Sequence, residues 1–256
     1  MKICRFNLEN QTSWGVLKDD LIYPFENLDF ENILSDFPNP SIFIKRNEVN
    51  FLPPVTPSKI VCVGRNYAEH AAELGNTVPK EPLLFLKAPS SLITEGDVIV
   101  IPKQSNQVEH EGELAIVVKR NCKNLSENDN PFDYIFGYTC LNDVTARDLQ
   151  RKDIQFTRAK SFDTFCPIGA SIETQLDVSD IRLITKVNGV IKQDGRTSQM
   201  VFSVPFLVRY ISNQMTLIAG DIIATGTPSG VSKLENGDKC EVEIEGIGTL
   251  QNLVKF

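Results

Sequence analysis

Histidine is scarce in this chain: its 256 residues include only two, together with one tryptophan and three methionines. The six cysteines form no CxxC pair and show no metal-like spacing, which argues against a cysteine-based metal site. Four of them, Cys62, Cys140, Cys166 and Cys240, stand among apolar neighbours. We expect these four to be reduced core residues rather than disulfide partners or nucleophiles.

Long apolar runs and basic clusters are also missing. No run reaches the roughly 18 to 20 residues that a membrane-spanning helix needs, and the start MKICRFNLENQ lacks the apolar core of a signal peptide. The formal net charge is -7 and the pI is near 5.0. These features argue against a membrane protein and against nucleic acid as the main partner. We therefore expect a soluble, cytoplasmic protein.

There is no Gly-rich phosphate motif, no internal repeat and no low-complexity tract, so neither a Rossmann nor a P-loop fold is favoured. Strand-like runs dominate instead, among them IVCVG, DVIVIP, ELAIVVKR, DYIFGYTC, LITKVNGV, DIIATG and KCEVEIEG. Helical patterns are few and fall at 67–75, 143–153 and 202–215. This balance predicts a β-rich α+β fold rather than a βαβ series.

A Pro-rich cluster, FLPPVTPSK at 51–59, predicts a linker. Before it the chain has three short strand-like pieces, KICRFN, SWGVLKD and DLIYPF, and then a polar segment that is loop-like or weakly helical. We expect a small β-rich N-terminal domain at 1–55 and a main domain at 56–256.

Two glutamates separated by one glycine, Glu111 and Glu113, directly precede an apolar run. In an extended strand, residues two apart point to the same face, so the two carboxylates lie side by side. Two ionised carboxylates at a buried strand repel each other unless a cation compensates them, and oxygen ligands suit Mg²⁺, Mn²⁺ or Ca²⁺ better than zinc. A solvated strand edge is the alternative interpretation.

His70 and Glu73 are three residues apart in an Ala-rich helical pattern, which places both side chains on one face. A carboxylate beside an imidazole orients it and raises its basicity. The alternative is an exposed pair on a surface helix. We interpret the other histidine, His110, as structural.

Asp143, Arg147 and Gln150 come after an apolar strand at positions i, i+4 and i+7. We expect Asp143 to cap the start of a helix whose face then offers a metal ligand, a guanidinium clamp for a carboxylate and an amide donor. An N-cap with an i,i+4 salt bridge explains the same spacing without function.

Two further segments have little meaning by themselves. Lys160 lies in a polar spot before an apolar, Pro-containing loop. Thr225 and Thr227 flank Gly226 at the end of a strand, where glycine allows close approach of a ligand and two hydroxyls can bind one. As a turn, this segment needs no function.

Taken together, these segments resemble the fumarylacetoacetate hydrolase family over roughly residues 55–256. The motifs that carry the resemblance are VGRNYAEHAAE, EHEGELAIVV, NDVTARDLQ, AKSFDTFCPIG, VNGVIKQDGRTSQM, GDIIATGTPSGV and NGDKCEVEIEGIGTLQN. The resemblance implies a mixed, barrel-like β-roll preceded by a small N-terminal domain, and it implies a homodimer.

The resemblance also assigns roles to residues. It implies that Glu111, Glu113 and Asp143 hold Mg²⁺, with Mn²⁺ or Ca²⁺ as alternatives. It implies that His70 and Glu73 form a catalytic dyad on a lid, and that Lys160 stabilises developing negative charge. Substrate-side positions are implied for Arg65, Arg147, Gln150 and Thr225.

A metal-dependent cleavage of a C–C bond in a small 2-keto acid is the activity that the resemblance implies first. Acylpyruvates such as fumarylpyruvate or acetylpyruvate would be hydrolysed, or oxaloacetate decarboxylated. The alternatives on the same metal site are isomerisation of 5-carboxymethyl-2-hydroxymuconate and tautomerisation of oxaloacetate. A catalytically silent scaffold is the third. The His70–Glu73 dyad favours cleavage because the resemblance ties it to activation of water.

Overall fold

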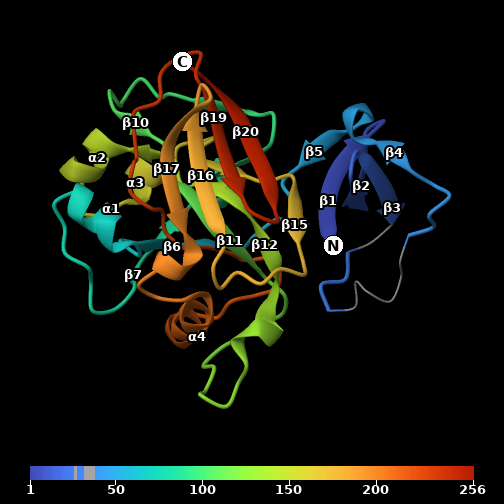
Figure 1. Ribbon diagram of the computed structural model, residues 1–256, viewed down its shortest axis with the longest axis horizontal. Coiled ribbons are helices and arrows are strands. Elements are labelled where there is room, and N and C mark those ends of the chain that lie inside the picture. The colour runs from blue at the N-terminus through green and yellow to red at the C-terminus, as the bar shows by residue number, and fades with distance from the viewer. Residues whose placement is uncertain (26–27, 32–37) are drawn as a thin grey trace.

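The computed structural model describes residues 1–25, 28–31 and 38–256 (Figure 1). These residues are rich in strands and contain few helices, which confirms the β-rich α+β class. Part of the polar segment expected to be loop-like or weakly helical, 26–27 and 32–37, lies outside the described residues. In the ranges that are described, no helix is both long and apolar enough to cross a membrane.

A large sheet of 13 strands forms one layer of the described structure. Its main path is β4-β3-β2-β1-β15-β12-β11-β18-β6-β7, and β5, β8 and β14 pair off this path. The strands are β1 (Lys2–Leu8), β2 (Gln11–Lys18), β3 (Leu21–Phe25), β4 (Ile44–Lys45), β5 (Asn50–Leu52), β6 (Ile60–Gly64), β7 (Leu83–Lys87), β8 (Leu92–Thr94), β11 (Gly112–Val118), β12 (Ile135–Asn142), β14 (Cys166–Ile168), β15 (Ser171–Glu173) and β18 (Ile222–Ala224).

Strand β11 is the centre of this layer because all seven of its residues are buried. Leu114 and Ile116 contribute to the core on one face of the sheet, whereas Ala115 and Val117 contribute to the core on the other. Because a strand covered on both faces needs apolar side chains on both, its sequence is an unbroken apolar run, as it is from Leu114 to Val118. Its neighbours β12 and β18 both run antiparallel to it.

A second sheet, in the order β17-β16-β19-β20-β9, covers β11 and β12 (Figure 1). It contains β9 (Val98–Val100), β16 (Arg182–Val187), β17 (Val190–Arg196), β19 (Lys239–Ile244) and β20 (Gly248–Lys255). In the described part of the chain each sheet has two ends, so the layers pack face to face without closing into a barrel. Two short strands, β10 (Val108–Glu109) and β13 (Thr145–Ala146), pair beside them.

The N-terminal strands continue the large sheet, since β1 pairs with β15 through Lys2–Cys4. They also enclose a small apolar cluster of their own, built from Cys4, Phe6, Leu17 and Ile22. The division into two domains at residue 55 stays a prediction.

The helices are short: α1 (Ala68–Glu73), α2 (Arg147–Lys152), α3 (Thr157–Lys160) and α4 (Val204–Gln214), with 3-10 turns η1 (Arg46–Glu48), η2 (Pro89–Ser91), η3 (Pro131–Tyr134) and η4 (Thr197–Gln199). The helical patterns at 67–75 and 202–215 are confirmed by α1 and α4. The expected N-cap at Asp143 is wrong, because α2 begins only at Arg147 with Ala146 as its cap residue. Asp143 instead lies in the link between β12 and β13.

All six cysteines are free and buried, so the prediction for Cys62, Cys140, Cys166 and Cys240 is confirmed. Burial raises the pKa of Cys140, Cys166 and Cys240 to about 12. Thiols of this kind behave as small apolar side chains rather than nucleophiles.

Candidate active site

A cavity of about 360 Å³ opens between α1 and the ends of β11, α2 and α3. Of the residues to which the resemblance assigns a role in the site, all but Thr225 line it; those that do are Arg65, His70, Glu73, Glu111, Glu113, Asp143, Arg147, Gln150 and Lys160. Aromatic rings of Phe85 and Phe156, packed edge to face at 5.6 Å, line it as well. The cavity therefore gathers groups from four segments far apart in the sequence.

Three carboxylates, those of Glu111, Glu113 and Asp143, lie on one side of the cavity with ligand atoms within 4.8 Å of one another. Each residue is 4% exposed or less. The antiparallel pairing of β11 with β12 places Asp143 beside Glu111, and the Asp143 amide donates to the Glu111 carbonyl oxygen at 2.8 Å. Alternation along the strand brings Glu113 to the same face.

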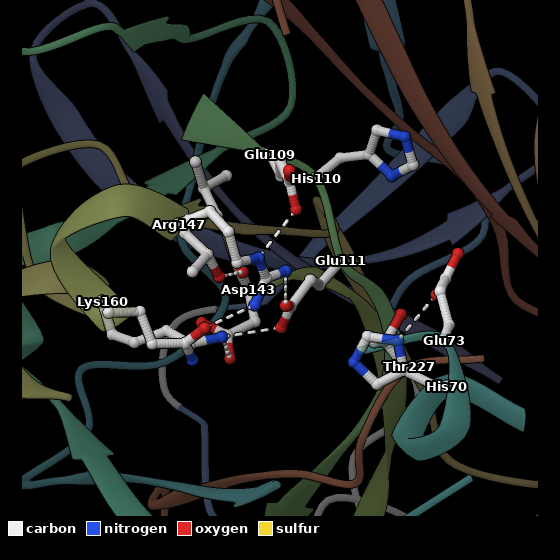
Figure 2. Close-up of polar contacts among 12 residues, drawn as sticks. His70, Glu73, Glu109, His110, Glu111, Asp143, Arg147, Lys160 and Thr227 are labelled. Carbon is white, nitrogen blue, oxygen red and sulfur yellow. Dashed lines mark hydrogen bonds and ion pairs between the residues drawn. The ribbon is translucent and has the colours of Figure 1, made fainter. Parts of the chain in front are cut away.

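Buried cations neutralise two of these three acids (Figure 2). Nζ of Lys160 donates to Oε2 of Glu111 and to Oδ2 of Asp143, both at 2.6 Å. Nζ of Lys87 donates to Oδ1 of Asp143 at 2.6 Å, and Arg147 forms an ion pair with Glu111. None of the three cationic residues is more than 2% exposed.

The acids differ in their electrostatics. Burial alone raises the pKa of Glu111, but attraction to Lys160 and Arg147 outweighs it and holds that pKa well below its usual range. Burial, followed by repulsion from Asp143 and Glu111, raises the pKa of Glu113 well above the usual value. Glu113 accepts a hydrogen bond from the Gly226 amide at 2.8 Å and has no ion pair with a described residue.

This donor set fits a divalent cation. It offers only oxygen ligands from three converging carboxylates, the set that Mg²⁺, Mn²⁺ and Ca²⁺ prefer. The cluster also contains, in Glu113, an acid that the neighbouring cations leave uncompensated. A bound cation would relieve the repulsion that raises the pKa of Glu113.

His70 and Glu73 face the carboxylates from the other side of the cavity (Figure 2). Nδ1 of His70 lies 3.2 Å from Oε2 of Glu73, which confirms that both share one face of α1. Because a carboxylate only accepts, Nδ1 carries the proton, and the other ring nitrogen is turned toward the carboxylate cluster. The arrangement is that of an oriented general base.

The substrate-side residues expected from the sequence have different environments. Each guanidinium nitrogen of Arg147 has a partner in the protein: Nε donates to Glu109 at 2.7 Å, one terminal nitrogen donates to Gln150 at 2.5 Å and the other pairs with Glu111. It orients Glu111 rather than standing free as a clamp. Thr225 is fully buried and donates to the Leu114 carbonyl at 2.9 Å.

Arg65 also lines the cavity but is held differently. Its φ of 59° lies in the left-handed region, which is uncommon for a residue other than glycine. Its guanidinium makes no hydrogen bond or ion pair with any other described residue. It is thus a cation available to a ligand.

Sequence reasoning missed two residues of the site, Lys87 and Glu109. Lys87 ends the apolar strand LLFLK and is 1% exposed, a buried charge that needed a partner. Glu109 fixes Arg147, and Thr227 lines the cavity in the place expected for Thr225. Of the two missed residues, only Lys87 could have been found from the sequence, because a lysine at the end of an apolar run indicates a buried charge.

His110 is structural, as expected. It is fully buried, and its ring nitrogens contact Gln193 Oε1 at 3.1 Å and Ser232 Oγ at 2.8 Å. Burial lowers its pKa, which favours the neutral imidazole.

Comparison with known proteins places the chain among relatives of this architecture. A sequence profile described as "Fumarylacetoacetate (FAA) hydrolase C-terminal" matches residues 59–255. The oxaloacetate tautomerase YisK of Bacillus subtilis (strain 168) is 41% identical over 229 residues, which are 84% of this chain and 76% of that protein.

Solved structures also resemble the chain over its whole length. A 5-carboxymethyl-2-hydroxymuconate delta-isomerase from Mycobacterium smegmatis matches with a TM-score of 0.89 and 40% identity, over 100% of this chain and 99% of that one. A fumarylacetoacetate hydrolase from psychrophilic Exiguobacterium antarcticum matches with a TM-score of 0.87 and 38% identity, over 100% and 99% respectively. The resemblance found in the sequence motifs is confirmed.

Proposed function

The chain belongs to the fumarylacetoacetate hydrolase family, and on that premise we propose that it is a divalent-metal-dependent enzyme whose principal reaction is keto–enol tautomerisation of oxaloacetate. The observation that carries the proposal is the placement of an oriented imidazole, His70, opposite three converging carboxylates in one cavity. The similarity to a protein named oxaloacetate tautomerase supports the choice of reaction.

Glu111, Glu113 and Asp143 would hold the cation, and Mg²⁺ is the ion we propose. When bound, it supplies a Lewis acid that orients a 2-keto carboxylate and stabilises the negative charge that develops on the keto oxygen. Lys160 and Arg147 keep two of the ligand carboxylates in place through their ion pairs. Lys160 adds positive charge beside the reacting end of the substrate.

Proton transfer is the task we assign to the dyad. For oxaloacetate, His70 would take a proton from C3 through its unprotonated ring nitrogen, and the imidazolium so formed would give that proton to the keto oxygen, which completes the enol. In the reverse direction His70 would take the proton from the enol oxygen and return it to C3. Glu73 holds the imidazole by its Nδ1–H and stabilises the imidazolium that forms. Arg65 would meet the second carboxylate of the substrate.

Cleavage of a C–C bond is the second candidate. The same His70–Glu73 pair can deprotonate a water that attacks the distal carbonyl of an acylpyruvate, and the similarity to a protein named fumarylacetoacetate hydrolase supports it. Decarboxylation of oxaloacetate needs no attacking water. The sequence alone favoured cleavage over tautomerisation; we reverse this order because the proposed proton transfer requires only groups already facing each other.

The two reactions are separable in one experiment. The protein with Mg²⁺ is mixed with freshly dissolved enol-oxaloacetate and, in a parallel sample, with acetylpyruvate. The ultraviolet absorbance of the enol and the NMR signals of the products are followed. Accelerated loss of the enol without pyruvate is the expected result. Pyruvate formed from acetylpyruvate or oxaloacetate at a higher rate would make cleavage the principal reaction, and no turnover of either would leave the scaffold alternative.

A homodimer, a cytoplasmic location and the lack of nucleic-acid or membrane partners stay predictions from the sequence.

A further inference from the structure

The segment VNGVIKQDGRTSQM has no role in the proposed chemistry, yet one of its residues, Gln193, lies at a junction between strand β11 and the turn at 227–230. Gln193, on β17 of the second sheet, is fully buried. Its Oε1 accepts from the Gly112 amide at 3.0 Å and contacts Nδ1 of His110 at 3.1 Å. Its Nε2 donates to Thr227 Oγ1 and to the Pro228 carbonyl, both at 2.7 Å. All four hydrogen-bonding positions of the amide are therefore used.

One end of this junction is the strand that carries the acids. Gly112 separates Glu111 from Glu113, and by strand alternation it points to the opposite face. A Cβ there would lie 2.1 Å from Thr185 Oγ1 and 3.4 Å from Gln193 Oε1, so only glycine allows this approach. Gln193 thus fixes β11 directly behind the carboxylates.

The other end is the turn at 227–230, which packs tightly on β17. A Cβ on Gly230 would lie 2.0 Å from the Lys192 carbonyl oxygen, and one on Gly195 would lie 2.6 Å from Cβ of Pro228. Gly230 also has a φ of 100°, in the left-handed region that favours glycine. The turn has little freedom to move relative to β17.

Helix α1, which carries the dyad, docks on this same turn. The Gly230 amide donates to Oε1 and Oε2 of Glu73 at 3.0 and 3.2 Å, and Ser229 Oγ donates to Oε2 of Glu69 at 3.2 Å. The α1 helix has no side-chain N-cap hydrogen bond of its own. Its dyad residue Glu73 is therefore oriented from outside by the turn.

The geometry points to Gln193 as a positioning residue that sets the dyad against the carboxylates. It touches neither, but it binds the strand of Glu111 and Glu113 on one side and the turn that orients Glu73 on the other. The inference deepens the proposed function and rests on it for the role of His70 and Glu73. An error of about 1 Å in such a placement costs roughly 100-fold in rate.

Hydrogen exchange tests this without any substrate. Gln193→Met keeps the length of the side chain and removes all four hydrogen bonds, and Gln251→Met, at an exposed position of β20 in the same sheet, is the matched control. We expect amides in 66–76 and 225–232 to exchange about tenfold faster in the Gln193 variant, while β19 amides keep their rates. Equal acceleration in all peptides, or no change in 66–76, would overturn the positioning role.

A second variant keeps the test decisive if Gln193→Met does not fold. Gln193→Glu retains an oxygen that accepts from Gly112 and loses the N–H donors to Thr227 and Pro228. Exchange should then rise in 225–232 and 66–76 but not in β11; the opposite distribution contradicts the inference.

Kinetics provide the second readout. We expect Gln193→Glu to lower kcat for the tautomerised substrate about tenfold with KM and Mn²⁺ affinity within about twofold, because binding groups remain while the base is misplaced. A loss confined to Mn²⁺ affinity would place Gln193 in support of the metal ligands alone. If the wild-type protein turns over no substrate, the proposed function fails, whereas the exchange data still decide how the dyad is held.

Discussion

The two sides of the cavity are built on different physical principles. On the carboxylate side, Glu111 and Asp143 are buried and fixed by ion pairs at 2.6 Å to Lys160 and Lys87. On the dyad side, a six-residue helix holds His70 and Glu73 through hydrogen bonds of 3.0 to 3.2 Å to each other and to one turn. Glu73 is also more exposed, at 32% of its side chain.

The carboxylate side must be rigid, whereas the dyad side can adjust. Charges buried without water require fixed partners, since an unpaired one is strongly destabilising. A short helix with few contacts opens at low free-energy cost, and it carries the more exposed of the two sides of the cavity. Substitutions on the two sides should therefore fail in different ways: on one side through the metal and the fold, on the other through the rate alone.

The largest effect is expected on the carboxylate side. Asp143→Ala removes a proposed ligand and leaves Lys87 and Lys160 without their shared partner, so metal affinity and activity should fall at least about a thousandfold. Calorimetric titration with Mn²⁺ and an enol-oxaloacetate assay measure both losses. Asp180→Ala, at an exposed aspartate, is the control and should change neither. Metal binding at the wild-type affinity in Asp143→Ala would remove this residue from the ligand set.

On the dyad side, substitutions should lower the rate and leave metal affinity unchanged. His70→Ala is expected to lower kcat about 10²- to 10⁴-fold, the usual contribution of a general base, while Mn²⁺ affinity stays within about twofold. Glu73→Gln should have a smaller effect in the same direction, because an amide still accepts from Nδ1 but does not stabilise an imidazolium. Turnover by His70→Ala at the parent rate would show that the dyad assignment is wrong.

Lys87 allows a test of stability rather than of rate. Lys87→Met breaks a fully buried ion pair, so the free energy of unfolding without metal should fall by about 3 kcal/mol. A divalent cation then compensates Asp143 in place of the lysine, so added Mg²⁺ should raise the Tm more in the variant than in the wild type. Lys186→Met, at a partly exposed pair with Glu243, serves as the control. If Mg²⁺ raised the Tm of Lys87→Met and of the wild type equally, the cation would not be replacing the lysine as the partner of Asp143.

Local periodicity was enough to predict the parts of the site that lie within one element. Alternation placed Glu111 and Glu113 on one face, and helical spacing joined His70 to Glu73. Local periodicity could not predict contacts between side chains on elements far apart in the sequence. Lys87 and Gln193 find their partners in segments far apart in the chain, and nothing local shows that Arg147 binds Glu109 and Glu111 in addition to its helical neighbour Gln150.

The same limit explains the fold-level results. Strand and helix types could be predicted from apolar patterns, but the early helix start at Asp143 was wrong because strand pairing through β13 occupies the residues before Arg147. Thr225 and Thr227 are indistinguishable in sequence as hydroxyls beside Gly226. Only the direction of each side chain decides that Thr227 lines the cavity while Thr225 bonds the Leu114 carbonyl.

The smallest expected effect concerns the distal end of the cavity, where Arg65 has no hydrogen bond or ion pair with the described residues. Arg65→Met removes the charge and Arg65→Lys keeps it, and neither changes the strain of a left-handed φ for a side chain other than glycine. KM for oxaloacetate should rise about tenfold in the methionine variant, the usual loss for a hydrogen bond to a charged group, and much less in the lysine variant. Deuterium exchange at C3 of 2-ketobutyrate, which lacks a second carboxylate, should be equal in all three proteins. If the rate of deuterium exchange into 2-ketobutyrate also fell in the methionine variant, Arg65 would act on the 2-keto acid end of the substrate instead. The dyad side of the cavity would then contribute to substrate binding as well as to rate.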